Sequence, residues 1–226
     1  THLLPKALKE ELGDHVNQSG SYVGPDRLRF DFTHFEGVSR KQLAAIERRV
    51  NETIMANYPV TSMVKDLQEA KAMGAVALFG EKYGSSVRVI EIGGYSLELC
   101  GGTHVPATGN IGLVRIISEG SVAAGIRRIE AAAGRLAFDL LHRQDQLLSD
   151  TSAVLNCSTD GLPDAASRLA ESRRTAEKEI QQLRQKLSSG TVNGLLAQAE
   201  KIGSVSLLSA EVDAADMEEL RTMGDA

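Results

Sequence analysis

The segment LELCGGTHVPATG, residues 97–109, places a cysteine four residues before a histidine across two glycines. A cysteine thiolate and an imidazole are common zinc ligands, and the spacing of Cys100 and His104 lets one metal ion contact both. Gly101 and Gly102 allow the backbone to turn tightly enough for the two side chains to converge. The alternative is a buried cysteine followed by an exposed turn histidine, and this segment alone leaves both interpretations open.

The composition is that of an ordinary globular protein. Its 226 residues suffice for one large or two ordinary domains, and a hydrophobic fraction of 42% can build a core. Aromatic residues make up only 4% and tryptophan is absent, so that core is mainly aliphatic. No apolar run is long enough to cross a bilayer, and the N-terminus lacks a signal-peptide pattern. Two cysteines form no disulfide framework. We therefore expect a cytoplasmic protein without a membrane partner.

The net charge of −5 argues against a protein that coats nucleic acid non-specifically, although it allows local recognition of an RNA end. Basic residues occur in four close pairs, each of which is either a solvated surface or a phosphate site: Arg27 and Arg29, Arg40 and Lys41, Arg48 and Arg49, and Arg127 and Arg128.

The first 135 residues carry signals for both helices and strands, which predicts an α+β fold with a mixed sheet. In chain order we expect a helix through residues 3–12 ended by Gly13, a strand within 21–35 approached through a Gly-Pro turn, a helix after an N-capping Ser39, a short helix ending near Gly74, two consecutive strands within 85–99, and a strand from residue 110 that leads into a glycine-rich turn.

Beyond this region the strand signals vanish. A helical stripe is formed by Ile129, Ala133, Leu136, Leu140 and Leu147, and an approximate heptad seam follows, formed by Leu169, Ala176, Ile180, Leu183 and Leu187. Because the strand signals are lost, we expect an antiparallel helical hairpin over residues 136–198 with little catalytic role. A coiled-coil scaffold is a further alternative, but the hairpin is too short to support it alone. Residues 199–226 predict a strand and an amphipathic helix.

Three segments in this order and spacing resemble the editing region of alanyl-tRNA synthetases: THLLPKALKEELGDHVNQSGSYVGPDRLRFDF, LELCGGTHV and GSVAAGIRRIEAAAG. The resemblance covers essentially the whole chain. It implies an editing (aminoacyl-tRNA deacylase) domain at 1–135, a helical hairpin linker at 136–198, and the truncated start of a C-terminal α/β domain at 199–226. The ATP-binding ligase core of such an enzyme would lie upstream, in cis.

The implied activity is hydrolysis of the ester that links serine or glycine to alanine tRNA. One missing methylene, or one added hydroxyl, changes binding by only ~1–3 kcal/mol, so a synthetase for alanine needs a second, hydrolytic site. The acceptor end of tRNA(Ala) carrying serine or glycine is then the partner. The alternatives are a free-standing editing protein that acts in trans and a non-catalytic, zinc-stabilised RNA-binding module.

The resemblance also implies a zinc site formed by His2, Cys100 and His104. A fourth family ligand would fall two residues before residue 1. His15 and His34 are poorer substitutes, because the first should lie near the end of a helix and the second at a strand edge.

Other site residues follow from the same resemblance. Thr1 and Gln18 match positions that line the amino-acid pocket, and Thr103 lies inside the metal loop. Without the family, Gln18 could equally be a loop amide that caps backbone groups. No Ser-His-Asp set is visible. We therefore expect zinc to orient or polarise, with water delivered partly by the ribose hydroxyl of the substrate.

Arg127 and Arg128 follow a glycine-rich turn and would suit a phosphate or ribose of the tRNA. Their alternative role is ionic pairing with Glu119 or Glu130. Asp31 is either a pocket residue or a structural carboxylate at a strand end.

Overall fold

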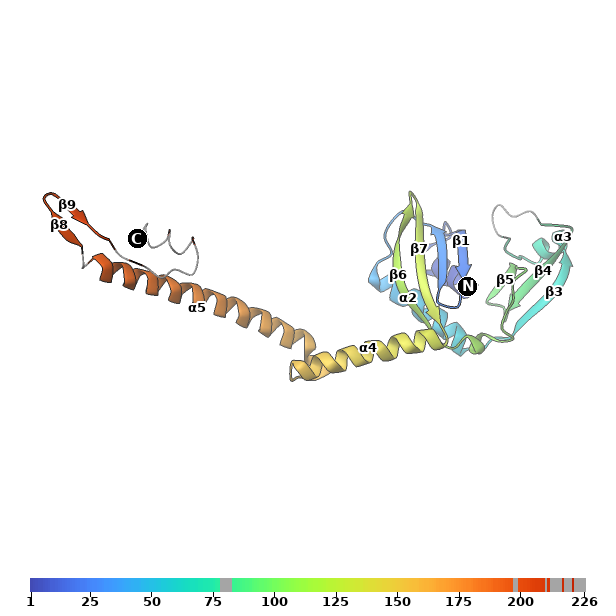
Figure 1. Ribbon diagram of the computed structural model, residues 1–226. Helices are drawn as coiled ribbons and strands as arrows, with labels where there is room; N and C mark the ends of the chain where they lie inside the picture. Colours follow the sequence, from blue (N-terminus) through green and yellow to red (C-terminus); the bar gives the residue numbers. More distant parts are fainter. Residues whose placement is uncertain (78–82, 197–198, 210, 212–216, 218–220, 222–226) are drawn as a thin grey trace. The chain divides into compact units, whose positions relative to one another are not determined.

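The computed structural model describes residues 1–77, 83–196, 199–209, 211, 217 and 221, and these form two compact units, 1–146 and 147–226 (Figure 1). Antiparallel sheets and helices form the first unit and a long helix dominates the second, which confirms the predicted α+β class. Within the described residues, no helix is long and apolar enough to span a membrane.

The described residues of the first unit form helices α1, α2 and α3, strands β1 to β7 and the beginning of α4 (Arg135–Val154). Their bounds are α1 Leu3–Leu12, β1 Gln18–Val23, β2 Leu28–Thr33, α2 Arg40–Met55, β3 Val60–Asp66, α3 Leu67–Ala72, β4 Ser86–Ile92, β5 Ser96–Leu99, the 3₁₀ turn η1 Thr108–Ile111, β6 Val114–Ala123 and β7 Ile126–Ala133.

A four-stranded antiparallel sheet in the order β1-β2-β7-β6 forms the larger core together with α1 and α2. Leu8, Phe30, Ile46 and Ile129 are fully buried there. Burying each such side chain contributes about 1.5–3 kcal/mol, so these contacts fix α1 against the sheet. The first turn of α1 is thereby held in place, and this matters because His2 directly precedes it.

The end of α1 and the start of α2 follow the predicted signals. Gly13 ends α1 with φ +112, a conformation that side chains rarely adopt. Ser39 accepts a hydrogen bond from the backbone of Gln42, whose side chain in turn accepts from the Ser39 backbone, and this capping box starts α2.

A smaller antiparallel sheet has the order β3-β4-β5. Its central strand β4 is buried on both faces. Val87 and Val89 pack into a second small core, whereas Ile90 and Ile92 belong to the larger core. Because strand side chains alternate between faces, β4 joins the two cores and fixes the small sheet beside α1.

Three sequence-based expectations need correction. The helix expected from Ile129 onward begins only at Arg135, because residues Ile126–Ala133 form strand β7. Its alanines have a weak strand propensity, and pairing with β2 and β6 overrides it. The single strand expected within residues 21–35 is a hairpin of β1 and β2. Strand β3 was not predicted, since its side chains are mostly polar and exposed.

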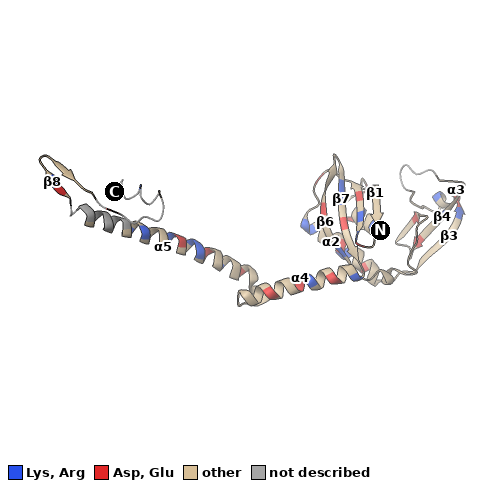
Figure 2. Cartoon of the chain, in the orientation of Figure 1, with Lys and Arg blue, Asp and Glu red and all other residues tan. Residues whose placement is uncertain are grey.

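In the second unit, the helix α5 (Leu162–Leu196) follows α4 (Arg135–Val154), which begins in the first unit, and the 3₁₀ turn η2 (Thr159–Gly161). Basic and acidic residues are interspersed along residues 164–186 of α5 (Figure 2). Its apolar residues Leu169, Ile180 and Leu183 are exposed. The antiparallel packing of the two helices stays a prediction, as do the domain boundaries.

A short hairpin of β8 (Glu200–Ile202) and β9 (Val205–Leu207) follows α5, which provides the predicted strand. The predicted amphipathic helix after it lies largely outside the described residues.

Candidate metal centre and adjoining cavity

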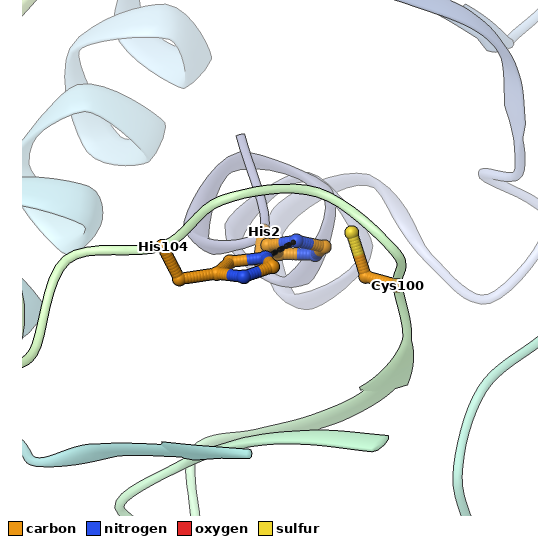
Figure 3. A group of neighbouring side chains, drawn as sticks. All are labelled: His2, Cys100 and His104. Atoms are coloured by element: carbon orange, nitrogen blue, oxygen red, sulfur yellow. Dashed lines mark hydrogen bonds between the residues drawn. The ribbon is translucent and has the colours of Figure 1, made fainter. Parts of the chain in front are cut away.

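The side chains of His2, Cys100 and His104 converge in the first unit (Figure 3). Their potential ligand atoms all lie within 4.8 Å of one another, and the Nε2 atoms of the two histidines are 3.0 Å apart. All three residues are half-buried. His2 comes from the start of α1, and the other two come from the loop after β5. We call these three residues the donor cluster.

Strand alternation explains why Cys100 faces His2. Ser96, Glu98 and Cys100 are two residues apart along and just beyond β5, so they share one face of the small sheet. Glu98 lies opposite Ile90, a residue of the larger core, and Cys100 packs against that same core. The face that carries Cys100 is therefore the one turned toward α1.

Arg88 holds the loop that carries two of the donors. Its backbone carbonyl accepts a hydrogen bond from the Cys100 backbone N–H at 3.1 Å, and its Nη1 donates to the Gly102 carbonyl at 2.6 Å. Gly102 N–H also donates to the Cys100 sulfur at 3.4 Å. These bonds fix the turn between Cys100 and His104.

A carboxylate orients His2. Nδ1 of His2 lies 2.5 Å from Oε2 of Glu98, whose other oxygen accepts from Ser96 Oγ at 2.5 Å. Burial acts to raise the pKa of Glu98, but the hydrogen bond and charge of His2, with the Ser96 hydroxyl, outweigh it and lower this pKa. A carboxylate that accepts from Nδ1–H leaves Nε2 with its lone pair directed at the donor cluster.

His104 is held in its neutral form. Burial lowers its pKa, and the nearby positive charges of His2 and Arg88 lower it further. Its Nδ1 is buried and has no hydrogen-bond partner among the described residues. Two imidazoles and a thiol, facing one another at this distance, are a donor set suited to zinc or a similar borderline cation. The residues therefore fit such an ion.

A cavity of about 330 Å³ adjoins the donor cluster. Glu98 connects the cavity to the donor cluster, because it contacts His2 and also lines the cavity. The lining comes from α1, the β1–β2 hairpin, the segment after α3 and β5, and consists of Pro5, Lys6, Lys9, Val16, Asn17, Gln18, Phe30, Gly74, Val76, Ala77, Tyr95, Ser96, Leu97 and Glu98.

Gln18 lines this cavity, and its Nε2 donates to Ser21 Oγ at 3.2 Å. Thr103 lies in the loop of the donor cluster and is exposed. Thr1 is also exposed, and its carbonyl accepts from the Leu4 backbone N–H at the start of α1. The roles of these three residues in a pocket stay predictions.

The two arginines of β7 are engaged by carboxylates. Arg127 makes two hydrogen bonds to Glu119, at 2.6 and 2.8 Å, and Arg128 makes two to Asp31, both at 2.7 Å. These bonds raise the pKa of both guanidinium groups. Each arginine retains only its remaining N–H groups for RNA, and such contacts stay a prediction.

His15 and His34 do not join the donor cluster. Their rings are stacked, and Nε2 of His15 lies 2.8 Å from Nδ1 of His34. Among the described residues, the group that could hold a metal ion contains neither of them.

Sequence analysis did not identify Glu98 or Arg88. The alternating pattern of β5 offered a signal for Glu98, because it places that residue on the same face as Cys100. No local signal links Glu98 to His2, which lies 96 positions earlier in the chain.

Comparison with known proteins matches residues 87–130 to the family described as "Threonyl and Alanyl tRNA synthetase second additional domain". The matched range contains β4, β5, Cys100 and His104.

Full-length relatives were also found. The alanine–tRNA ligase of Acetivibrio thermocellus is 47% identical over 225 residues, and those of Geobacillus thermodenitrificans and Clostridioides difficile are 49% and 43% identical over the same length. Each alignment covers 100% of this chain and 26% of the relative. The chain thus spans about a quarter of the relatives' length. It is similar from end to end to a segment of these alanine–tRNA ligases, and its residues 87–130 match the second additional domain of threonyl and alanyl tRNA synthetases.

Proposed function

We propose that this chain is the editing segment of an alanine–tRNA ligase and hydrolyses the ester bond of tRNA(Ala) mischarged with serine or glycine. The observation that carries the proposal is the donor cluster joined through Glu98 to a cavity that Gln18 lines. A group suited to a metal ion and an amide suited to a hydroxyl thus lie at one cavity. The parent enzyme would supply the ATP-dependent ligase core and act in the cytoplasm.

The specificity problem of the parent enzyme supports this reading. A pocket for alanine admits glycine, which is smaller, and discriminates poorly against serine, which adds one hydroxyl. An editing site must then accept serine and glycine while sparing alanine. Gln18 suits this task, because its Nε2 is engaged by Ser21 and its carbonyl oxygen can accept a hydrogen bond from a seryl hydroxyl.

The donor cluster suggests how the ester is activated. Zinc bound there would act as a Lewis acid toward a carbonyl or water oxygen. The residues of the chain hold the geometry: Glu98 orients His2, and Arg88 fixes the loop between Cys100 and His104. We find no Ser-His-Asp arrangement among the contacts of the described residues. Water positioned partly by the ribose hydroxyl of the substrate is the nucleophile that we favour.

The test is a deacylation assay with tRNA(Ala) charged with serine, glycine or alanine. We expect hydrolysis of the first two and sparing of the third. Binding of all three without hydrolysis would replace the proposal with a non-catalytic RNA-binding module. Activity on free tRNA would not by itself separate a trans-acting editing protein from a ligase segment. For that distinction, the encoding reading frame should extend upstream into an ATP-binding core.

A further inference from the structure

We propose that Lys6 and Lys9 bind the phosphodiester that precedes the terminal nucleoside of an RNA whose 3′ end enters the 330 Å³ cavity. This inference rests on the proposed function. It assigns the contact with the RNA backbone to α1 and not to the arginines of β7, and it names a phosphate as the ligand.

The first step is the size of the cavity. At about 330 Å³ it falls within the range of roughly 300–1,000 Å³ typical of small-molecule sites. A seryl or glycyl group has only a few atoms, so it would fill a minor part of this space. The nucleoside that carries the ester fits the remainder. The phosphate on the 5′ side of this nucleoside must then lie at the rim of the cavity, beside one of the lining elements.

The second step is the placement of the lysines. Lys6 and Lys9 are three residues apart on α1, so they lie one above the other on the same side of the helix. The opposite side is fixed in the larger core by Leu4 and Leu8. The helix is therefore a rigid support that presents two ammonium groups to the cavity.

The third step is the charge balance. Glu98, the one carboxylate among the described residues of the lining, is engaged by His2 and Ser96. Lys9 makes no ion pair with any residue that the structure describes. Lys6 lies 4.0 Å from Glu10, but Glu10 makes a shorter contact of 2.7 Å to Arg49. Positive charge therefore remains available on this side of α1.

A comparison with β7 favours the lysines over the arginines. Arg127 and Arg128 each face a carboxylate with two hydrogen bonds, so a phosphate there would compete with an existing partner. An RNA phosphate at Lys9 displaces none. Lysine is also a suitable phosphate ligand, since its ammonium acts as a point charge.

The experiment uses the full chain and two substrates, seryl-tRNA(Ala) and 3′-O-seryl adenosine, which carries the same ester but no phosphate. The variants are Lys6→Ala/Lys9→Ala and a matched control, Arg40→Ala/Lys41→Ala, which removes two exposed charges from the start of α2. We expect the first variant to lower kcat/KM for seryl-tRNA roughly tenfold at low salt, because both positive charges that bind the phosphodiester are lost. Its activity on seryl adenosine should fall clearly less, because that substrate carries no phosphate.

The salt dependence sharpens the test. Loss of one single-strand phosphate contact should reduce the slope of log affinity against log salt by about 0.7. Lys6→Arg/Lys9→Arg should restore both affinity and slope. An equal fall on both substrates, no fall on seryl-tRNA, or the same fall in the control would overturn the inference while wild-type hydrolysis stands. If the wild-type chain hydrolyses neither substrate, the proposed function itself fails.

Discussion

Two polar groups of the first unit, the donor cluster and the arginines of β7, differ in how far their members satisfy one another. Arg127 and Arg128 are each matched by a carboxylate of opposite charge, with good geometry. In the donor cluster two imidazole nitrogens face each other at 3.0 Å beside a thiol, and His104 Nδ1 is buried without a partner among the described residues.

This difference suggests a structural role for the arginine pairs and a functional role for the donor cluster. Buried polar groups are normally paired, and an exception calls for an explanation such as a missing ion. The arginine pairs need none, because they tie β7 to its neighbours β2 and β6. The donor cluster needs one. The following predictions test whether the donor cluster is functional and the arginine pairs of β7 are structural.

The largest effect is expected for Cys100→Ala. Because a thiolate is the strongest zinc ligand of the three, its removal should abolish the binding of about one zinc ion per chain and the hydrolysis of seryl-tRNA. Elemental analysis and the deacylation assay measure the two outcomes. Cys157→Ala is the matched control, since that residue lies in the second unit, and it should retain both. Unchanged zinc content in Cys100→Ala would show that the donor cluster is not a metal site.

The next effect is expected for Glu98→Ala. Loss of the partner that orients a metal-binding imidazole typically lowers metal affinity about 10- to 100-fold. Competition with a chromophoric chelator measures the zinc affinity. Glu98→Gln should lose less, since an amide oxygen still accepts a hydrogen bond from His2 Nδ1. Glu91→Ala, on the neighbouring strand β4, is the control. Equal affinities in all three variants would contradict the role of Glu98.

A smaller and substrate-dependent effect is expected for Gln18→Ala. A buried polar group left unpaired costs roughly 1–3 kcal/mol, which corresponds to about 5- to 150-fold in rate for serine. Glycine lacks the hydroxyl, so its hydrolysis should change less. Asn17→Ala, which alters another amide of the same cavity, serves as control. If both substrates lost activity equally, Gln18 would serve the ester or the fold instead of the hydroxyl.

The sequence predicted elements whose signals are local. Ser39 with Gln42 and the glycine at position 13 mark helix ends through bonds within a few residues, and the structure confirms them. Strand β7 was missed because Ile129 and Ala133, four residues apart, also fit a helical stripe that continues to Leu136. Pairing with two other strands decides its conformation, and no local pattern contains that information.

The same limit applies to the candidate site. The spacing of Cys100 and His104 is visible in the sequence, and the family resemblance adds His2. Which cations remain available is not visible, because Arg128 meets Asp31 across 97 positions of the chain. Sequence reasoning therefore named the most conspicuous arginines, whereas the cavity is lined by Lys6 and Lys9.

The smallest effect concerns the Asp31–Arg128 pair and appears only in acid. The hydrogen bond from Arg128 is the main cause that lowers the pKa of Asp31 below its ordinary value. The unfolded chain then binds more protons than the folded chain near that value, so the pair contributes stability above about pH 4 and loses it as pH falls through the lowered pKa. Asp31→Asn should therefore flatten the decline of unfolding free energy as the pH falls below about 4, as measured by denaturant titrations. Asp26→Asn, an exposed carboxylate 3.9 Å from Arg27, should leave that decline intact. If Asp31→Asn kept the wild-type pH dependence and instead altered tRNA binding, Arg128 would have a functional role like that of the donor cluster. The contrast between the donor cluster and the arginines of β7 would then fail.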